Sequence, residues 1–146
     1  MINPITTIEI LLIEDNPGDV RLTQEGLAQA KVHNRLWIAY DGETALSMLR
    51  NEPPHEHVPR PDMILLDLNL PGRSGFEVLQ AIKSDEKLLT VPVIVLSSSA
   101  AERDVLTSYD LHANVYITKP QDFEQFVEIV HSIEQFWFTV AKLPTR

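Results

Sequence analysis

Five short apolar runs alternate with longer stretches of helical period along the chain, and this alternation limits the fold more than any other feature. It is typical of strand–helix units built around a parallel sheet. Because crossover connections are right-handed, helices must cover both faces of the sheet, and the favoured strand order is 2-1-3-4-5. The sequence therefore predicts an α/β, doubly wound, flavodoxin-like fold of five parallel strands. The expected strands cover residues 8–13, 35–40, 62–66, 92–96 and 114–117, and the expected helices cover about 18–31, 43–51, 75–85, 101–109 and 121–140.

The length and composition indicate a single domain over residues 1–146, and they exclude several classes of function. The chain has no cysteine, so disulfides, thiol nucleophiles and thiolate metal sites are excluded. A net charge of −9 argues against nucleic-acid binding, because that affinity comes from Lys and Arg side chains that neutralise phosphates. No stretch approaches the roughly 18 apolar residues of a membrane span. We therefore expect a cytoplasmic protein that binds neither nucleic acid nor membranes.

Polar side chains follow four of the expected strands, at the point where each strand ends. Glu14 and Asp15 follow the first strand, Asp67 the third, Ser97 the fourth and Lys119 the fifth. Ligands of open parallel sheets bind at these carboxyl ends, where the strand order reverses. Three carboxylates placed together repel one another unless a cation shares the site, and an all-oxygen set without His or Cys suits Mg²⁺ or the similar ion Mn²⁺. We expect a divalent cation and Lys119 to compensate the charge of Asp67 at the end of its apolar run.

Each of these residues also has an ordinary structural explanation when it is taken alone. Glu14 and Asp15 precede an Asn-Pro pair that is typical of the start of a helix. Asp67 could form a turn, the serine triplet at 97–99 could open the helix that follows, and Lys119 could be a solvated surface lysine. Their joint occurrence at four strand ends favours one shared site over four separate explanations.

Four segments, LLIEDNPGD, ILLDLNLPGRSG, VPVIVLSSS and VYITKP, resemble the receiver domain of two-component response regulators, in order and over essentially the whole chain. The resemblance implies a phosphoacceptor that takes part in its own phosphotransfer and dephosphorylation and is not otherwise an enzyme. It implies a single receiver domain over residues 1–146 with no effector domain, and a sensor histidine kinase as the partner. It also implies the role of each site residue: Asp67 as the phosphoacceptor, Glu14, Asp15 and Asp67 as metal-site acids, the Asn69 backbone carbonyl as a further Mg²⁺ ligand, Lys119 as the family's lysine before a proline usually joined by a cis peptide, and Ser97 and Tyr116 as switch residues.

A narrower resemblance concerns the pathway in which the protein acts. Residues 51–61, which contain four prolines and read as a surface loop, are longer than the corresponding loop of most receivers. This loop and the ending IEQFWFTVAKLP are similar to the single-domain regulators that partner cyanobacterial phytochrome kinases. Phosphorylation would then alter the surface formed by the fourth helix, the fifth strand and the fifth helix.

The last expected helix combines a core stripe with two flanking aromatic residues. Phe136 and Phe138 lie beside the stripe, and if they project outward they form an apolar patch of the kind that marks an interface. We expect a homodimer through the fourth helix, fifth strand and fifth helix. The core stripe, with i, i+3, i+4 and i+7 spacing, consists of Phe123, Phe126, Val127, Val130, Ile133 and Trp137.

Two other functions compete with the receiver interpretation. A dehalogenase-like, Mg²⁺-dependent phosphohydrolase also uses an Asp nucleophile at a strand end, but that class needs an acid two residues further on, where Asn69 stands. A receiver-like scaffold that is never phosphorylated is the second alternative. The presence of the full set of acids, Ser97 and Lys119 argues against it.

Overall fold

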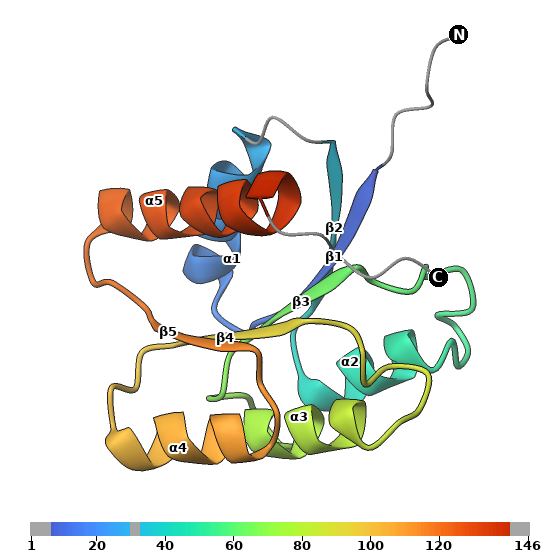
Figure 1. The fold of residues 1–146 in the computed structure, drawn as a ribbon. Helices are drawn as coiled ribbons and strands as arrows, with labels where there is room; N and C mark the ends of the chain where they lie inside the picture. Colours follow the sequence, from blue (N-terminus) through green and yellow to red (C-terminus); the bar gives the residue numbers. More distant parts are fainter. Residues whose placement is uncertain (1–6, 30–32, 141–146) are drawn as a thin grey trace, which may run out of the picture.

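The structure, a computed structural model, describes residues 7–29 and 33–140, with side chains as far as Trp137. Five strands form one parallel sheet in the order β2-β1-β3-β4-β5, which confirms the predicted topology. In Figure 1 the central strands run through the middle of the molecule, with helices above and below them. The strands are β1 (Ile8–Ile13), β2 (Asn34–Ala39), β3 (Met63–Leu66), β4 (Val93–Ser97) and β5 (Val115–Thr118).

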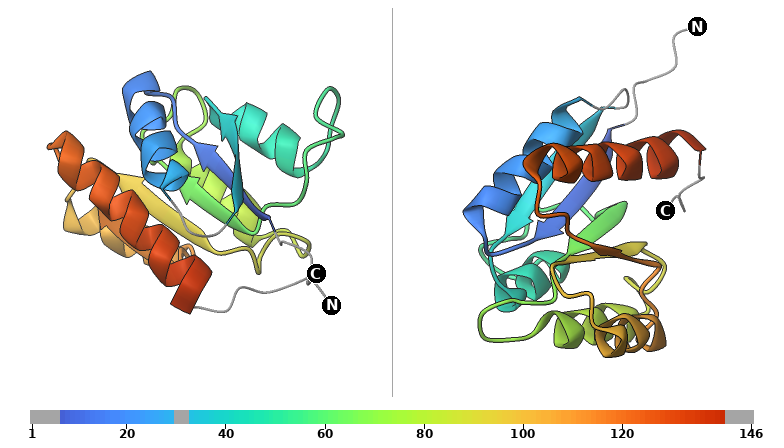
Figure 2. Two further views of the ribbon diagram at one scale, coloured as in Figure 1. Left: turned by 90° about the horizontal axis from the view of Figure 1, so that it is seen from above. Right: turned by 90° about the vertical axis from the view of Figure 1, so that its left-hand side faces the viewer.

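Helices cover both faces of the sheet, as the right-handed crossovers require. Helices α1 and α5 pack side by side on one face, and α2, α3 and α4 lie on the other (Figures 1 and 2). The bounds are α1 Pro17–Ala28, α2 Gly42–Leu49, α3 Gly75–Lys83, α4 Glu102–Asp110 and α5 Phe123–Glu134, and α5 continues into a π-helix, η1, at Gln135–Val140.

The two faces of the sheet explain the continuous apolar runs in the sequence. Alternate residues of β1, such as Leu11 and Ile13, join the core beneath α2 and α3, while Ile10 and Leu12 join the core beneath α1 and α5. All four residues of β3 are buried. A strand that is covered on both sides has no solvated face, so it needs no polar alternation.

Four of the five helices begin with a side chain that accepts a hydrogen bond from the first turn. Asn16 caps α1, Asp41 caps α2, Ser74 caps α3 and Asp122 caps α5, whereas α4 has no such bond at Ala101. These caps satisfy backbone N–H groups that would otherwise lack a partner. They also fix where each connection from the sheet ends, and so they position the residues at the carboxyl edge.

The proline-rich segment 51–61 forms a loop between α2 and β3, as predicted, and it projects beyond α2 in Figure 2. The side-chain amide of Asn51 donates to the Val58 carbonyl at 2.6 Å, and Val58 is buried in the core. The loop is therefore anchored at its end.

Across the described residues, no helix is long and apolar enough to cross a membrane.

The prediction for the last helix is correct in its centre and wrong at its first residue. Phe126, Val130 and Ile133 are buried, and Val127 and Trp137 are partly buried, whereas Phe123 is 74% exposed. Phe123 is the first residue of α5 and lines an open groove beside α1, so the periodic stripe begins before the helix reaches the core.

Candidate functional site

Three carboxylates meet at the carboxyl edge of the sheet, where the sequence predicted a cation site. Glu14 follows β1, Asp15 is the next residue, and Asp67 follows β3. One oxygen from each lies within 4.8 Å of the other two. Glu14 and Asp67 are 2% and 6% exposed, while Asp15 faces solvent. A set of converging carboxylate oxygens open to water on one side is the donor set that a hard divalent cation takes. The residues present therefore fit a divalent metal.

Backbone hydrogen bonds hold Glu14 and Asp67 rigidly, because the sheet-type bonding extends one residue beyond the ends of β1 and β3. The Asp67 N–H donates to the Ile13 carbonyl at 3.0 Å, and the Glu14 N–H donates to the Ala39 carbonyl at 3.0 Å. Asp67 then opens a turn, in which its Oδ1 accepts from the Asn69 N–H at 3.2 Å. The turn function that was an alternative for Asp67 is thus present together with its place in the acidic cluster.

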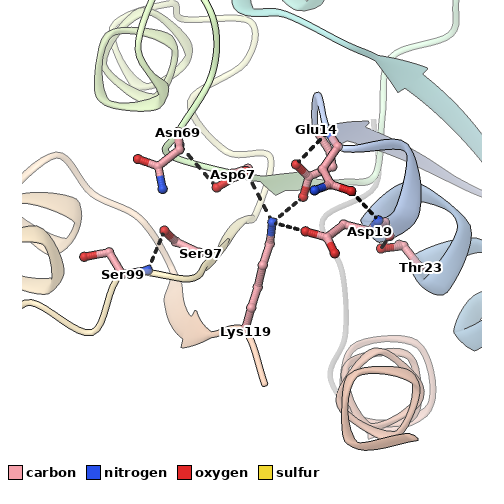
Figure 3. A network of polar contacts seen from close by, with 9 residues as sticks. Glu14, Asp19, Thr23, Asp67, Asn69, Ser97, Ser99 and Lys119 are labelled. Atoms are coloured by element: carbon pink, nitrogen blue, oxygen red, sulfur yellow. Dashed lines mark hydrogen bonds and ion pairs between the residues drawn. The ribbon is translucent and has the colours of Figure 1, made fainter. Parts of the chain in front are cut away.

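Lys119 reaches three carboxylates from the end of β5, as Figure 3 shows. Its Nζ lies 2.5 Å from Glu14 Oε1, 2.8 Å from Asp19 Oδ2 and 3.3 Å from Asp67 Oδ2. The Lys119 side chain is 8% exposed. It is therefore a buried counter-ion of the cluster, and the alternative of a solvated surface lysine is wrong.

The electrostatics of the cluster appear in two pKa shifts. Burial raises the pKa of Glu14 to about 8, and Asp67 adds to the rise while Lys119 opposes it. Burial alone would lower the pKa of Lys119, but hydrogen bonds to Asp19 and Glu14 and the nearby negative charges raise it above its ordinary value. One ammonium is thus held firmly charged, yet it does not fully compensate the buried acids.

Asp19 is a site residue that the sequence did not reveal. It lies in the first turn of α1, where its N–H donates to the capping Asn16 side chain at 3.1 Å. Its carboxylate contacts Lys119, but it does not belong to the group of three oxygens suited to a metal. An acid in a first helical turn is common for stability alone, so only the position of that turn at the carboxyl edge could have indicated a role in the site.

Ser97 and Tyr116 lie in a second network beside the acids. Ser97 is the last residue of β4 and is fully buried, and its Oγ accepts from the Ser99 N–H at 3.2 Å. Its carbonyl accepts from the Lys119 N–H at 2.7 Å, which ties β4 to the lysine. The partly buried Tyr116 donates its hydroxyl to the Ser99 carbonyl at 2.6 Å. A chain of contacts therefore leads from the acidic edge to β5.

Two other expectations concern the backbone and the interface. Within the described residues, the only cis peptide bond is Pro53–Pro54, so Lys119–Pro120 does not have the cis geometry that the resemblance implied. Phe136 projects outward and is 53% exposed, as expected. The side chain of Phe138 lies outside the described residues.

A flavodoxin-like sheet with three acids and a lysine at its carboxyl edge defines the class of receiver domains. The chain belongs to the response regulators: residues 10–131 match the response regulator receiver domain family. This confirms the predicted family, and it identifies the chain as a response regulator rather than a catalytic enzyme.

Relatives with the same fold are closely similar over nearly their full length. The chain is 44% identical to response regulator Rcp1 of Synechocystis over 135 residues, which cover 92% of each protein. The crystal structure of the phosphorylated cyanobacterial phytochrome response regulator RcpA matches with a TM-score of 0.93 and 48% identity, covering 96% of this chain and all of RcpA. The Mn²⁺-bound form of Rcp1 matches with a TM-score of 0.91 and 43% identity, covering 94% of this chain and 99% of Rcp1.

Proposed function

We propose that this protein is a phosphoacceptor that receives a phosphoryl group on Asp67 from the phosphohistidine of a sensor histidine kinase. The observation that carries the proposal is the convergence of Glu14, Asp15, Asp67 and Lys119, which come from three separate strand ends, at one edge of the sheet. In this reaction the N–P bond of the phosphohistidine breaks and a bond from an Asp67 carboxylate oxygen to phosphorus forms. The nucleophile needs no general base, because an ionised carboxylate attacks directly.

Such a transfer depends on positioning and on neutralising the charge of the three equatorial phosphoryl oxygens. Asp67 is held in place by the Asp67–Ile13 backbone bond and by the turn to Asn69. Lys119 lies beside Asp67 Oδ2 and can donate to a phosphoryl oxygen. Ser97 can donate its hydroxyl to another, since the Ser97 Oγ accepts from the Ser99 N–H and no bond donated by it is found among the described residues.

Glu14, Asp15 and Asp67 are the side chains that would hold a divalent cation, and we propose Mg²⁺, or Mn²⁺ in its place, with the Asn69 carbonyl as a further ligand. When bound, the cation would neutralise negative charge on the transferred phosphoryl group. The similar protein Rcp1 has been solved in a Mn²⁺-bound form, and this supports the assignment for the present chain.

We propose that Ser97 and Tyr116 transmit the change to the surface of α4, β5 and α5. Phosphorylation replaces one negative charge by nearly two and adds strong acceptors, which would draw the Ser97 hydroxyl toward Asp67. Ser97 precedes Ser99 by two residues, and the Ser99 carbonyl already accepts from the Tyr116 hydroxyl. We therefore expect the segment from Ser97 to Ser99 to shift and to carry the bonded Tyr116 hydroxyl with it, rather than a free rotation of an exposed ring.

The kinase partner that we propose is a phytochrome. The support is the similarity over nearly the whole chain to RcpA, a cyanobacterial phytochrome response regulator. Phosphotransfer from purified phytochrome kinases, compared with kinases of other sensory classes, would test this assignment. A faster reaction with a kinase of another class would contradict it.

We also propose a homodimer through α4, β5 and α5. The strand β5 lies at the edge of the sheet, and an apolar groove of about 310 Å³ runs between it and the end of α5. Phe136 lines this groove, and Leu106 on α4 is 57% exposed. A second copy of the chain would cover the same apolar surface on both partners, which suits a twofold interface.

Incubation with acetyl phosphate and Mg²⁺ tests the central proposal. We expect a base-labile adduct of one phosphoryl group on the wild-type protein and none on Asp67→Asn, which keeps the shape of the side chain but removes the nucleophile. Asp15→Asn should fold normally, but it should take up little phosphoryl group. Equal labelling of Asp67→Asn and wild type would refute the assignment, and turnover of many small phosphoesters would indicate a phosphohydrolase instead.

A further inference from the structure

Asp19 lies outside the group of three metal-site acids, but its carboxylate contacts the buried Lys119. The three N–H donors of Lys119 face three carboxylates, and the distance to Asp19 Oδ2 is 2.8 Å while that to Asp67 Oδ2 is 3.3 Å. The ammonium therefore lies closer to the Asp19 carboxylate than to that of Asp67, and Figure 3 shows it between the two. Asp19 is itself held by α1, since its N–H donates to Asn16 and its carbonyl accepts from Thr23.

An ammonium cannot give the same hydrogen bond twice. The Lys119 N–H that donates to Asp19 could otherwise donate to a phosphoryl oxygen on Asp67. The charge of Asp19 also compensates the positive charge of Lys119, which would otherwise repel a divalent cation at the neighbouring acids. Asp19 thus acts in opposite directions on two ligands of the same site: it favours the cation and opposes the phosphoryl group.

We propose that Asp19 is a positioning residue for phosphotransfer. It holds the Lys119 ammonium beside its own carboxylate, which weakens the repulsion between that ammonium and the cation and withholds one N–H donor from the phosphoryl group. This inference rests on the proposed function of Asp67. It assigns to α1 a part in setting how strongly the phosphorylated state is stabilised.

The test uses Mn²⁺ and beryllofluoride, an analogue of the phosphoryl group, on the full chain. In Asp19→Asn we expect the dissociation constant for Mn²⁺ to rise about fivefold, and that for beryllofluoride at saturating Mn²⁺ to fall about fivefold, since a partly exposed ion pair contributes effects of this size. Asp19→Glu keeps the charge and should behave like wild type. Glu77→Gln removes a similar charge from the first turn of α3, away from Lys119, and should change neither constant.

The two opposite signs separate this role from a structural one. A misfolded or loosened α1 would weaken both ligands, so a loss of both affinities in Asp19→Asn and in a second neutral variant, Asp19→Ser, overturns the inference. Unchanged affinities overturn it as well. A beryllofluoride gain that persists at full size in the Lys119→Met background also overturns it, because Asp19 would then act without the lysine. Failure of the wild-type protein to bind beryllofluoride would instead refute the proposed function.

Discussion

The substitution Gly75→Ala provides a sharp test of how the fold positions Asp67. Gly75 is the first residue of α3, and its N–H donates to the Leu68 carbonyl at 3.0 Å. A Cβ added there would lie 2.5 Å from Leu68 Cα and 2.6 Å from the Asp67 carbonyl oxygen. Both neighbours are backbone atoms, so neither can move aside by changing a rotamer. Relief requires a shift of the segment that carries Asp67.

The size of the destabilisation follows from how closely the added Cβ would approach these two backbone atoms. Contacts between such atoms are normally near 3.5–4.0 Å, so the backbone must move by about 1 Å, and overpacking of this kind costs about 1–3 kcal/mol. The gain in helix propensity from Gly to Ala opposes it by up to about 1 kcal/mol. We therefore expect a net loss of about 1–2 kcal/mol in the free energy of unfolding. Because the Asp67 carbonyl is displaced, the affinity for Mn²⁺ should also fall.

Urea unfolding and Mn²⁺ titration of the same samples measure both effects. Gly72→Ala is the matched control, because Gly72 lies in the same loop at φ +72° and an added Cβ would meet no atom within 4 Å. Its left-handed backbone should cost about 1 kcal/mol of stability with no change in Mn²⁺ affinity. If Gly75→Ala keeps the stability and the metal affinity of the wild type, the argument from close backbone contact is wrong.

Three further outcomes are expected. Lys83→Met should lower the free energy of unfolding by about 2 kcal/mol in urea titrations, because the Lys83 ammonium donates to two backbone carbonyls and one side-chain amide oxygen between α3 and β5; an unchanged midpoint would contradict this. Phe136→Ser should halve the mass in light scattering while Phe123→Ser, at the other end of α5, leaves it unchanged; equal masses for both variants and wild type would count against the dimer face. The pKa of Glu14 is raised to about 8, so protons compete with the cation below that pH: Mn²⁺ affinity measured by calorimetry should rise from pH 6 to about 8 and level off above, and a flat profile would disprove the competition.

The parts of the site that could be predicted are those fixed by the topology of the sheet. Glu14, Asp67 and Lys119 each follow a strand, and parallel strands bring their carboxyl ends to one edge whatever the details of packing. Asp67 was conspicuous because an apolar run ends in a charge. The order of the strands follows from the handedness of crossovers, and it needed no side-chain information.

The parts that could not be predicted depend on how helices lie on the sheet. Asp19 is in a first helical turn, and a contact with Lys119, a hundred positions away, depends on the direction in which α1 leaves the edge. Phe123 fits the apolar period of α5 but is exposed, because periodicity does not state where a helix overhangs the core. Glu134 is fully buried on the same helix, where its Oε2 lies 3.7 Å from His131 Nε2, and a charged residue beside a core stripe gave no sign of that burial.

The charges at the edge explain why a cation and the lysine must act together in the proposed phosphotransfer. When all groups are ionised, the carboxylates of Glu14, Asp15, Asp19 and Asp67 outnumber the single ammonium of Lys119 by three charges. Phosphorylation of Asp67 would add nearly one more negative charge. Two like charges 4 Å apart repel by about 4 kcal/mol at an effective dielectric constant of 20, so the lysine alone cannot make the edge accept a phosphoryl group. A divalent cation removes most of the excess but competes with the ammonium for the same acids. An acid such as Asp19, whose carboxylate contacts the ammonium from outside the group of three metal-site oxygens, lets both cations remain at one small site.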